Sequence, residues 1–79
     1  MNRAVVLKNI RRAIESSPRN AYVAELHLQS IKYADLLKDL SGREFCEAVG
    51  IGPSFGTEFL KMRKISERLL DAGLDVSKI

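Results

Sequence analysis

The feature that most constrains the fold of this sequence is a run of apolar residues at helical spacing near its C-terminal end. Intervals of four, three, three, four and three residues separate Phe55, Phe59, Met62, Ile65, Leu69 and Ala72. This spacing places the six side chains on one face of an α-helix, whereas the two faces of a strand alternate at every residue. The sequence therefore predicts a helix over residues 54–72, with Ser54 as its N-cap, Gly73 as its stop and the apolar face in the core.

Three further helices are predicted before this one, over residues 2–16, 20–40 and 42–49. The first carries an apolar stripe and ends at Ser16-Ser17-Pro18, because the residue before a proline disfavours helical geometry. In the second segment, apolar and polar residues also alternate as they would in a strand. The segment runs for about twenty residues without Gly or Pro, which is longer than a usual strand, so we expect one helix that is apolar on two sides. The third begins with the capping pair Ser41 and Glu44 and ends at Gly50.

The predicted fold class is therefore all-α: a single domain over residues 1–79, built as a small bundle of about four helices. A chain of 79 residues is too short to bury two independent cores. No apolar run approaches the roughly 18 to 20 residues that span a bilayer, so we expect neither a membrane partner nor a signal peptide.

The scarcity of reactive residues limits the chemistry that this chain can perform. Cys46 is the only cysteine and His27 the only histidine, so we expect no disulfide, no metal site and no cofactor, and a reducing cytoplasmic location. No base and nucleophile are paired in the sequence. We therefore expect a protein that is not an enzyme and has no small-molecule substrate.

Residues 43–62, REFCEAVGIGPSFGTEFLKM, read as a short capped helix, a tight turn and a longer helix. Cys46 occupies the position where the first helix needs a small residue, and Gly50 occupies the position of the turn glycine. Ile51 corresponds to the apolar residue after the turn that fixes the angle between the helices, and Phe59 to a core residue of the second helix. Over residues 41–73 the chain resembles the helix-turn-helix of small bacterial DNA-binding regulators. It departs from that pattern at Gly56, where the family has a β-branched or similar apolar residue, so the turn or the crossing of the helices is expected to differ.

The resemblance implies a small transcriptional regulator that binds double-stranded DNA, and the distribution of charge agrees with this. The formal charge is +3, and residues 1–19 hold five basic residues against one acidic residue. If the first and last helices lie side by side, their basic residues form one phosphate-binding surface. The expected phosphate contacts are Arg11, Arg12, Lys61, Arg63, Lys64 and Arg68, and Ser54, Thr57 and Glu58 are expected nearest to the base edges.

The second predicted helix has an apolar flank that suggests a partner. We expect a homodimer through this helix, involving Tyr22, Leu28 and Ile31, which would place two reading helices about one DNA turn apart. The alternative hypothesis is a helical protein–protein interaction module, an adaptor without nucleic-acid binding, in which residues 43–62 are a structural hairpin. Charge reversal at Lys61, Arg63 and Lys64 separates the two hypotheses, because only DNA binding depends on those charges.

Overall fold

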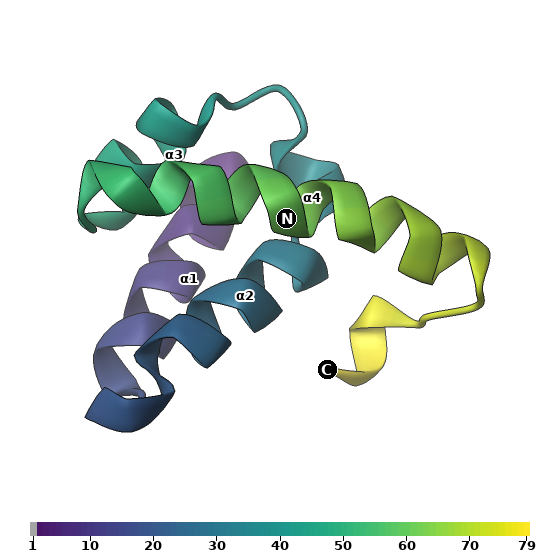
Figure 1. Cartoon of the computed structure of the whole chain (residues 1–79), viewed down its shortest axis with the longest axis horizontal. Helices are drawn as coiled ribbons and strands as arrows, with labels where there is room; N and C mark the ends of the chain where they lie inside the picture. Colours follow the sequence, from purple (N-terminus) through teal and green to yellow (C-terminus); the bar gives the residue numbers. More distant parts are fainter. Residues whose placement is uncertain (1) are drawn as a thin grey trace.

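The computed structural model describes residues 2–79, which fold into four α-helices joined by short 3₁₀ turns (Figure 1). No strand is present among these residues, so the predicted all-α class is confirmed. None of their helices combines the length and apolar character needed to cross a bilayer. In chain order the elements are α1 (Arg3–Ser16), η1 (Arg19–Ala21), α2 (Tyr22–Lys32), η2 (Ala34–Leu37), α3 (Gly42–Val49), η3 (Pro53–Phe55), α4 (Gly56–Asp71) and η4 (Val76–Lys78).

Helices α1 and α3 begin and end where local sequence signals place them. The Asn2 side chain accepts a hydrogen bond from the Val5 amide at 2.9 Å, and α1 ends at Ser16, ahead of Ser17-Pro18. At α3 the Ser41 side chain accepts from the Glu44 amide while Glu44 accepts from the Ser41 amide, which confirms the capping box. Gly50 ends α3 in the left-handed conformation, with φ of 80°.

The prediction of one continuous helix over residues 20–40 is wrong. Helix α2 ends at Lys32, Tyr33 leaves helical geometry with φ of −109° and ψ of 11°, and the chain continues as η2. The break turns Leu37 and Leu40 into the core, where they are 0% and 7% exposed. Tertiary packing thus outweighs a local sequence that contains no helix-breaking residue.

The predicted start of the last helix is also wrong. Pro53 opens the 3₁₀ turn η3, Ser54 is exposed within it, and α4 begins at Gly56 without a side-chain cap. The apolar face of α4 is buried only in part: Phe59 is fully buried, but Ile65 and Leu69 are 46% and 37% exposed. Helix α4 has 16 residues, and its second half extends past the core that α1, α2 and α3 provide.

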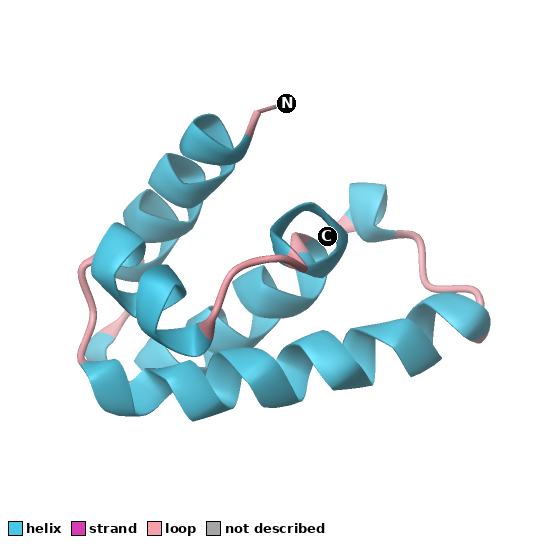
Figure 2. Ribbon diagram, turned by 90° about the horizontal axis from the view of Figure 1, so that it is seen from above, coloured by secondary structure: helices cyan, strands magenta, loops and turns pink. Residues whose placement is uncertain are grey.

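One core unites the four helices. Val6, Ile10 and other residues of α1 pack with residues of α2, η2 and α3 around the fully buried pair Phe45 and Phe59. The rings of this pair are stacked, with centroids 4.0 Å apart and planes 6° from parallel. Figure 2 shows the result from above: α1, which follows the N-terminus, and α4, the long helix leading to the C-terminal tail, lie on opposite sides of the molecule.

Candidate nucleic-acid interface

Helices α3 and α4 form a hairpin in which two glycines, Gly42 and Gly56, bring the backbones into tight contact. A Cβ atom added at Gly42 would lie 2.8 Å from the Gly56 carbonyl oxygen and 2.9 Å from its Cα. Gly56 is therefore the position at which α4 touches α3, which explains the departure from the resembled pattern: a β-branched residue has no room here. Cys46, the expected small position, is buried with its Sγ 4.0 Å from the Pro53 carbonyl oxygen, but it is not part of the tight contact between Gly42 and Gly56.

The outer side of α4 presents a row of exposed cations. Three cations and one threonine share this side of the helix, because intervals of four, three and four residues separate Thr57, Lys61, Lys64 and Arg68. All four side chains are exposed. None of the three cations forms an ion pair with another residue in the range 2–79. We call Thr57, Lys61, Lys64 and Arg68 the α4 basic face.

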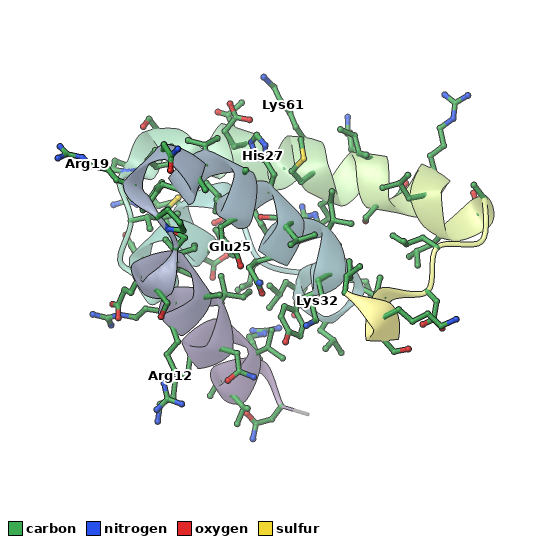
Figure 3. The ribbon with its side chains drawn as sticks, turned by 90° about the horizontal axis from the view of Figure 1, so that it is seen from below. Arg12, Arg19, Glu25, His27, Lys32 and Lys61 are labelled. Carbon is green, nitrogen blue, oxygen red and sulfur yellow. The ribbon has the colours of Figure 1, made fainter. Side chains whose placement is uncertain are left out.

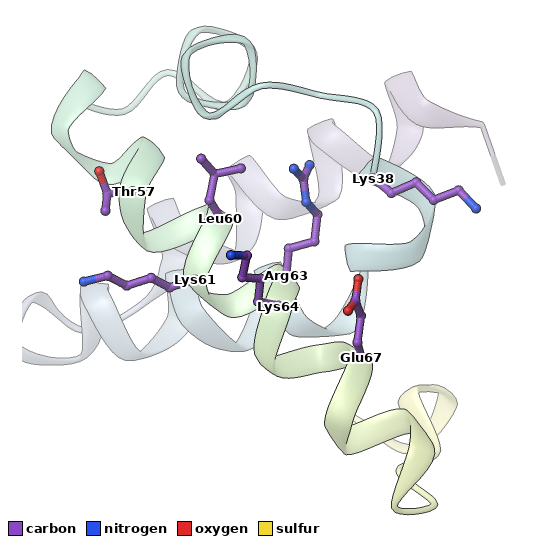
Figure 4. A pocket seen from close by; sticks show the side chains of 7 residues that line it. All are labelled: Lys38, Thr57, Leu60, Lys61, Arg63, Lys64 and Glu67. Carbon is purple, nitrogen blue, oxygen red and sulfur yellow. The ribbon is translucent and has the colours of Figure 1, made fainter.

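A shallow groove of about 570 Å³ runs beside this face (Figure 4). Its lining residues are Lys38, Thr57, Leu60, Lys61, Arg63, Lys64 and Glu67. Lys38 comes from the segment after η2, which only the break in the second helix brings beside α4. The groove is thus bordered by exposed ammonium groups and by the exposed side chain of Leu60.

Arg63, expected to contact phosphate, is engaged inside the fold. Its Nη1 donates to the carbonyl oxygens of Leu37 at 3.1 Å and Leu40 at 2.7 Å, and its guanidinium lies 5.1 Å from the centre of the Phe59 ring. These hydrogen bonds satisfy carbonyl groups at the end of the irregular segment that replaces the predicted helix. Arg63 therefore connects α4 to this segment, a role that no local pattern in the sequence signals.

The three residues expected nearest to the base edges occupy three different situations. Thr57 is exposed on α4, and Ser54 is exposed in η3, ahead of the helix. The Glu58 carboxylate is instead turned toward α2, where its Oε2 lies 3.1 Å from His27 Nε2, and both side chains are about one-third exposed. The pairing of His27 with Glu58 depends on the packing of α2 against α4.

Arg11 and Arg12 lie on α1, away from the α4 basic face. Helix α1 packs mainly against α2 and α3, and α4 packs against the same two helices. The condition for a single basic surface, that the first and last helices lie side by side, is therefore not met. In Figure 3 the side chains of Arg12 and Lys61 point to opposite sides of the molecule. Arg11 is exposed and pairs with Glu15 through Nε and Oε1 at 3.0 Å. The basic residues therefore form two surfaces rather than one.

The residues expected in a dimer interface are only partly available. Tyr22 packs on Phe55, with ring centroids 5.7 Å apart, and belongs to the edge of the core. Ile31 is half-buried, and Leu28 is 40% exposed. Helix α2 thus exposes the apolar side chains of Val23 and Leu28, with Ile31 half-buried, rather than a continuous second apolar side.

The arrangement of α3, a glycine turn and a longer basic helix, supported by α1 and α2, defines a helix-turn-helix-like protein. The chain matches the family of HTH-like domains over residues 2–72, which is nearly its whole length, and it belongs to that family. The match extends well beyond the residues 41–73 that carry the resemblance in the sequence, because it includes α1 and α2. Comparisons with curated proteins and with solved structures gave no match.

Proposed function

We propose that this protein binds double-stranded DNA through the α4 basic face and acts as a small transcriptional regulator. The observation that carries the proposal is the row of unpaired cations Lys61, Lys64 and Arg68 on the open side of the second helix of an HTH-like unit. A major groove about 12 Å wide admits an α-helix, and cations flanking that helix reach the phosphates on either side.

The division of roles follows from the positions of the side chains. Lys61, Lys64 and Arg68 supply the electrostatic, sequence-independent part of binding. Thr57, on the same face one turn before Lys61, is the residue best placed to meet a base edge, with Ser54 ahead of it. Glu58 is held by His27 at the flank, so that its negative charge is directed toward α2 rather than toward DNA.

We also propose that two copies pair through Leu28 and Ile31 of α2. A two-fold dimer presents two copies of α4, which matches the two half-sites that many helix-turn-helix dimers bind. The exposed fraction of Leu28 supports this, because such a side chain gains from burial against a partner. Mass in solution for the wild type and for Leu28→Glu tests it: the variant is expected to be monomeric, and a monomeric wild type would contradict the proposal.

The test of DNA binding is the salt dependence of affinity for a mixed-sequence duplex. Wild-type affinity is expected to fall steeply between about 50 and about 200 mM salt, and Lys61→Ala is expected to reduce the slope by about one phosphate contact. Lys78→Ala is the matched control, because Lys78 is also exposed but lies in η4, outside the α4 basic face. It should leave the slope unchanged.

Two results would contradict the proposal. One is the absence of wild-type binding at the lower salt concentration, since the electrostatic part of binding is strongest there. The other is an equal effect of Lys61→Ala and Lys78→Ala, which would mean that only net charge matters. The first result favours the interaction module, for which the exposed Leu60, Ile65 and Leu69 offer apolar contacts. The second refutes the α4 basic face as the binding surface.

A further inference from the structure

The outward side of α1 carries a second cluster of cations that the proposed DNA contact does not use. Lys8, Arg11 and Arg12 are all exposed, and we call them the α1 basic face. Glu15 is the only acidic residue in the first 24 positions, and Arg11 pairs with it. Lys8 and Arg12 form no ion pair with any residue in the described range 2–79.

This face is separated from the α4 basic face by the thickness of the protein. The molecule measures 24 Å along its shortest axis, and in the view down that axis α4 lies in front and α1 behind (Figure 1). Arg12 and Lys61 point in opposite directions in the perpendicular view (Figure 3). The surface of a duplex curves away from a protein that touches it, so a straight duplex on α4 leaves the α1 basic face unoccupied.

We infer that the α1 basic face binds the phosphate backbone of a second DNA segment, so that one molecule bridges two duplexes. This inference rests on the proposed function of the α4 basic face. Binding at α1 requires no base recognition, because the available side chains are cations suited to phosphate contacts. The two faces thus have different tasks: α4 enters a groove, and α1 holds a backbone.

The composition of α1 favours a phosphodiester backbone over a membrane or a protein surface. The apolar residues that a membrane-bound helix would insert into lipid, Val6, Ile10 and Ile14, are buried in the core. Val5, 42% exposed, is the only large apolar side chain that α1 exposes, so the face lacks the apolar centre typical of protein interfaces. A partner recognised by charge alone fits these side chains.

Bridging is tested with beads that carry an immobilised duplex: a protein that bridges two duplexes captures a second, fluorescent duplex on them. Fluorescence anisotropy measures binding to a single duplex in parallel. The variants are Lys8→Glu/Arg12→Glu on α1 and the charge-matched Lys61→Glu/Lys64→Glu on α4. We expect the wild type to capture the second duplex. The α1 variant should bind one duplex within about twofold of the wild type but capture at least about tenfold less, and the α4 variant should lose both activities.

Lys8→Gln/Arg12→Gln is a milder second variant that adds no negative charge beside Glu15, and circular dichroism melting verifies that each variant is folded. The amount of second duplex captured by Lys8→Gln/Arg12→Gln is expected to lie between the amounts captured by the wild type and by Lys8→Glu/Arg12→Glu. Normal bridging by the folded α1 variants would overturn the inference, because dimers that use two α4 faces would then account for the capture.

Three further outcomes separate failure of the inference from failure of the proposed function. If the α1 variants weaken binding to one duplex as much as the α4 variant does, both faces contact the same DNA, and bridging is refuted. If the wild type binds one duplex but captures no second one, only the inference fails. If it binds no duplex at all, the proposed function fails and the inference fails with it.

Discussion

Substitution of Gly42 by alanine tests the contact that sets the distance between α3 and α4. The added Cβ would lie 2.8 Å from the Gly56 carbonyl oxygen, whereas ordinary contacts of such an atom begin at 3.4 Å. The obstructing atoms belong to the backbone and cannot rotate away, so the two helices must separate by about 0.6 Å at this point.

The expected cost follows from two opposing effects. Forcing an extra carbon into a closely packed contact typically costs about 1–3 kcal/mol. Replacing glycine by alanine at a compatible site stabilises by about 0.4–1 kcal/mol, because the unfolded chain loses freedom. The net expectation is a loss of about 1–2 kcal/mol, which for a domain of this size lowers the melting temperature by about 5–15 °C. Gly56→Ala should have a smaller effect, because its Cβ would lie 3.0–3.1 Å from Gly42.

The assay is thermal unfolding followed by circular dichroism, with Gly52→Ala as the matched control. A Cβ at Gly52 would meet only the Phe55 ring, at 3.8 and 3.9 Å, and the backbone φ of −60° suits any residue. The control is therefore expected to melt at or slightly above the wild-type temperature. If Gly42→Ala also melts at or above the wild-type temperature, the helices are not in contact at these glycines.

Three other predictions follow from particular side chains. Arg63→Ala should destabilise the fold by about 1–3 kcal/mol in urea unfolding, because the Leu40 carbonyl loses its donor and the Leu37 carbonyl keeps only the Leu40 amide; a wild-type midpoint would contradict this. The hydrogen bonds from Ser41 lower the pKa of Glu44 in the folded protein. The ionised Glu44 carboxylate therefore contributes its full stabilisation above the ordinary pKa of a glutamate, and this stabilisation is lost as the pH falls through the lowered pKa of the folded state. Urea midpoints at about pH 7 and about pH 3 should therefore differ less in Glu44→Gln than in the wild type, and an identical difference would refute the argument. Burial raises the pKa of the Cys46 thiol, so alkylation by iodoacetamide at neutral pH should be much slower in the folded protein than in urea, and equal rates would show that the thiol is accessible.

The exposed second half of α4 shows how a local pattern can give the right element and the wrong burial. Helical spacing correctly predicts a helix through Ile65 and Leu69, because spacing depends on the backbone period alone. Whether those side chains are buried depends on which side of α4 the neighbouring elements cover, and here they cover Ser66, which is 2% exposed, rather than Ile65 and Leu69. Ser66 is the one residue of α4 after Phe59 that is buried, and its hydroxyl donates to the Arg63 carbonyl oxygen at 2.7 Å.

Features with short-range causes were determined by the sequence alone. The capping box of Ser41 and Glu44, the left-handed Gly50 and the end of α1 before Pro18 each involve residues at most a few positions apart. Their energies depend on backbone geometry that neighbouring residues impose, so a local pattern suffices to predict them. The all-α class and the hairpin of α3 and α4 follow from such signals.

Features that join distant residues were decided only by the tertiary structure. The end of α2 at Lys32, the contact of Gly42 with Gly56 and the pairing of His27 with Glu58 each depend on which helix packs against which. The placement of the α1 and α4 basic faces on opposite sides has the same origin, since charge counts carry no direction in space. Long-range packing selects among arrangements that are locally almost equal in energy, and that selection is made by the core as a whole.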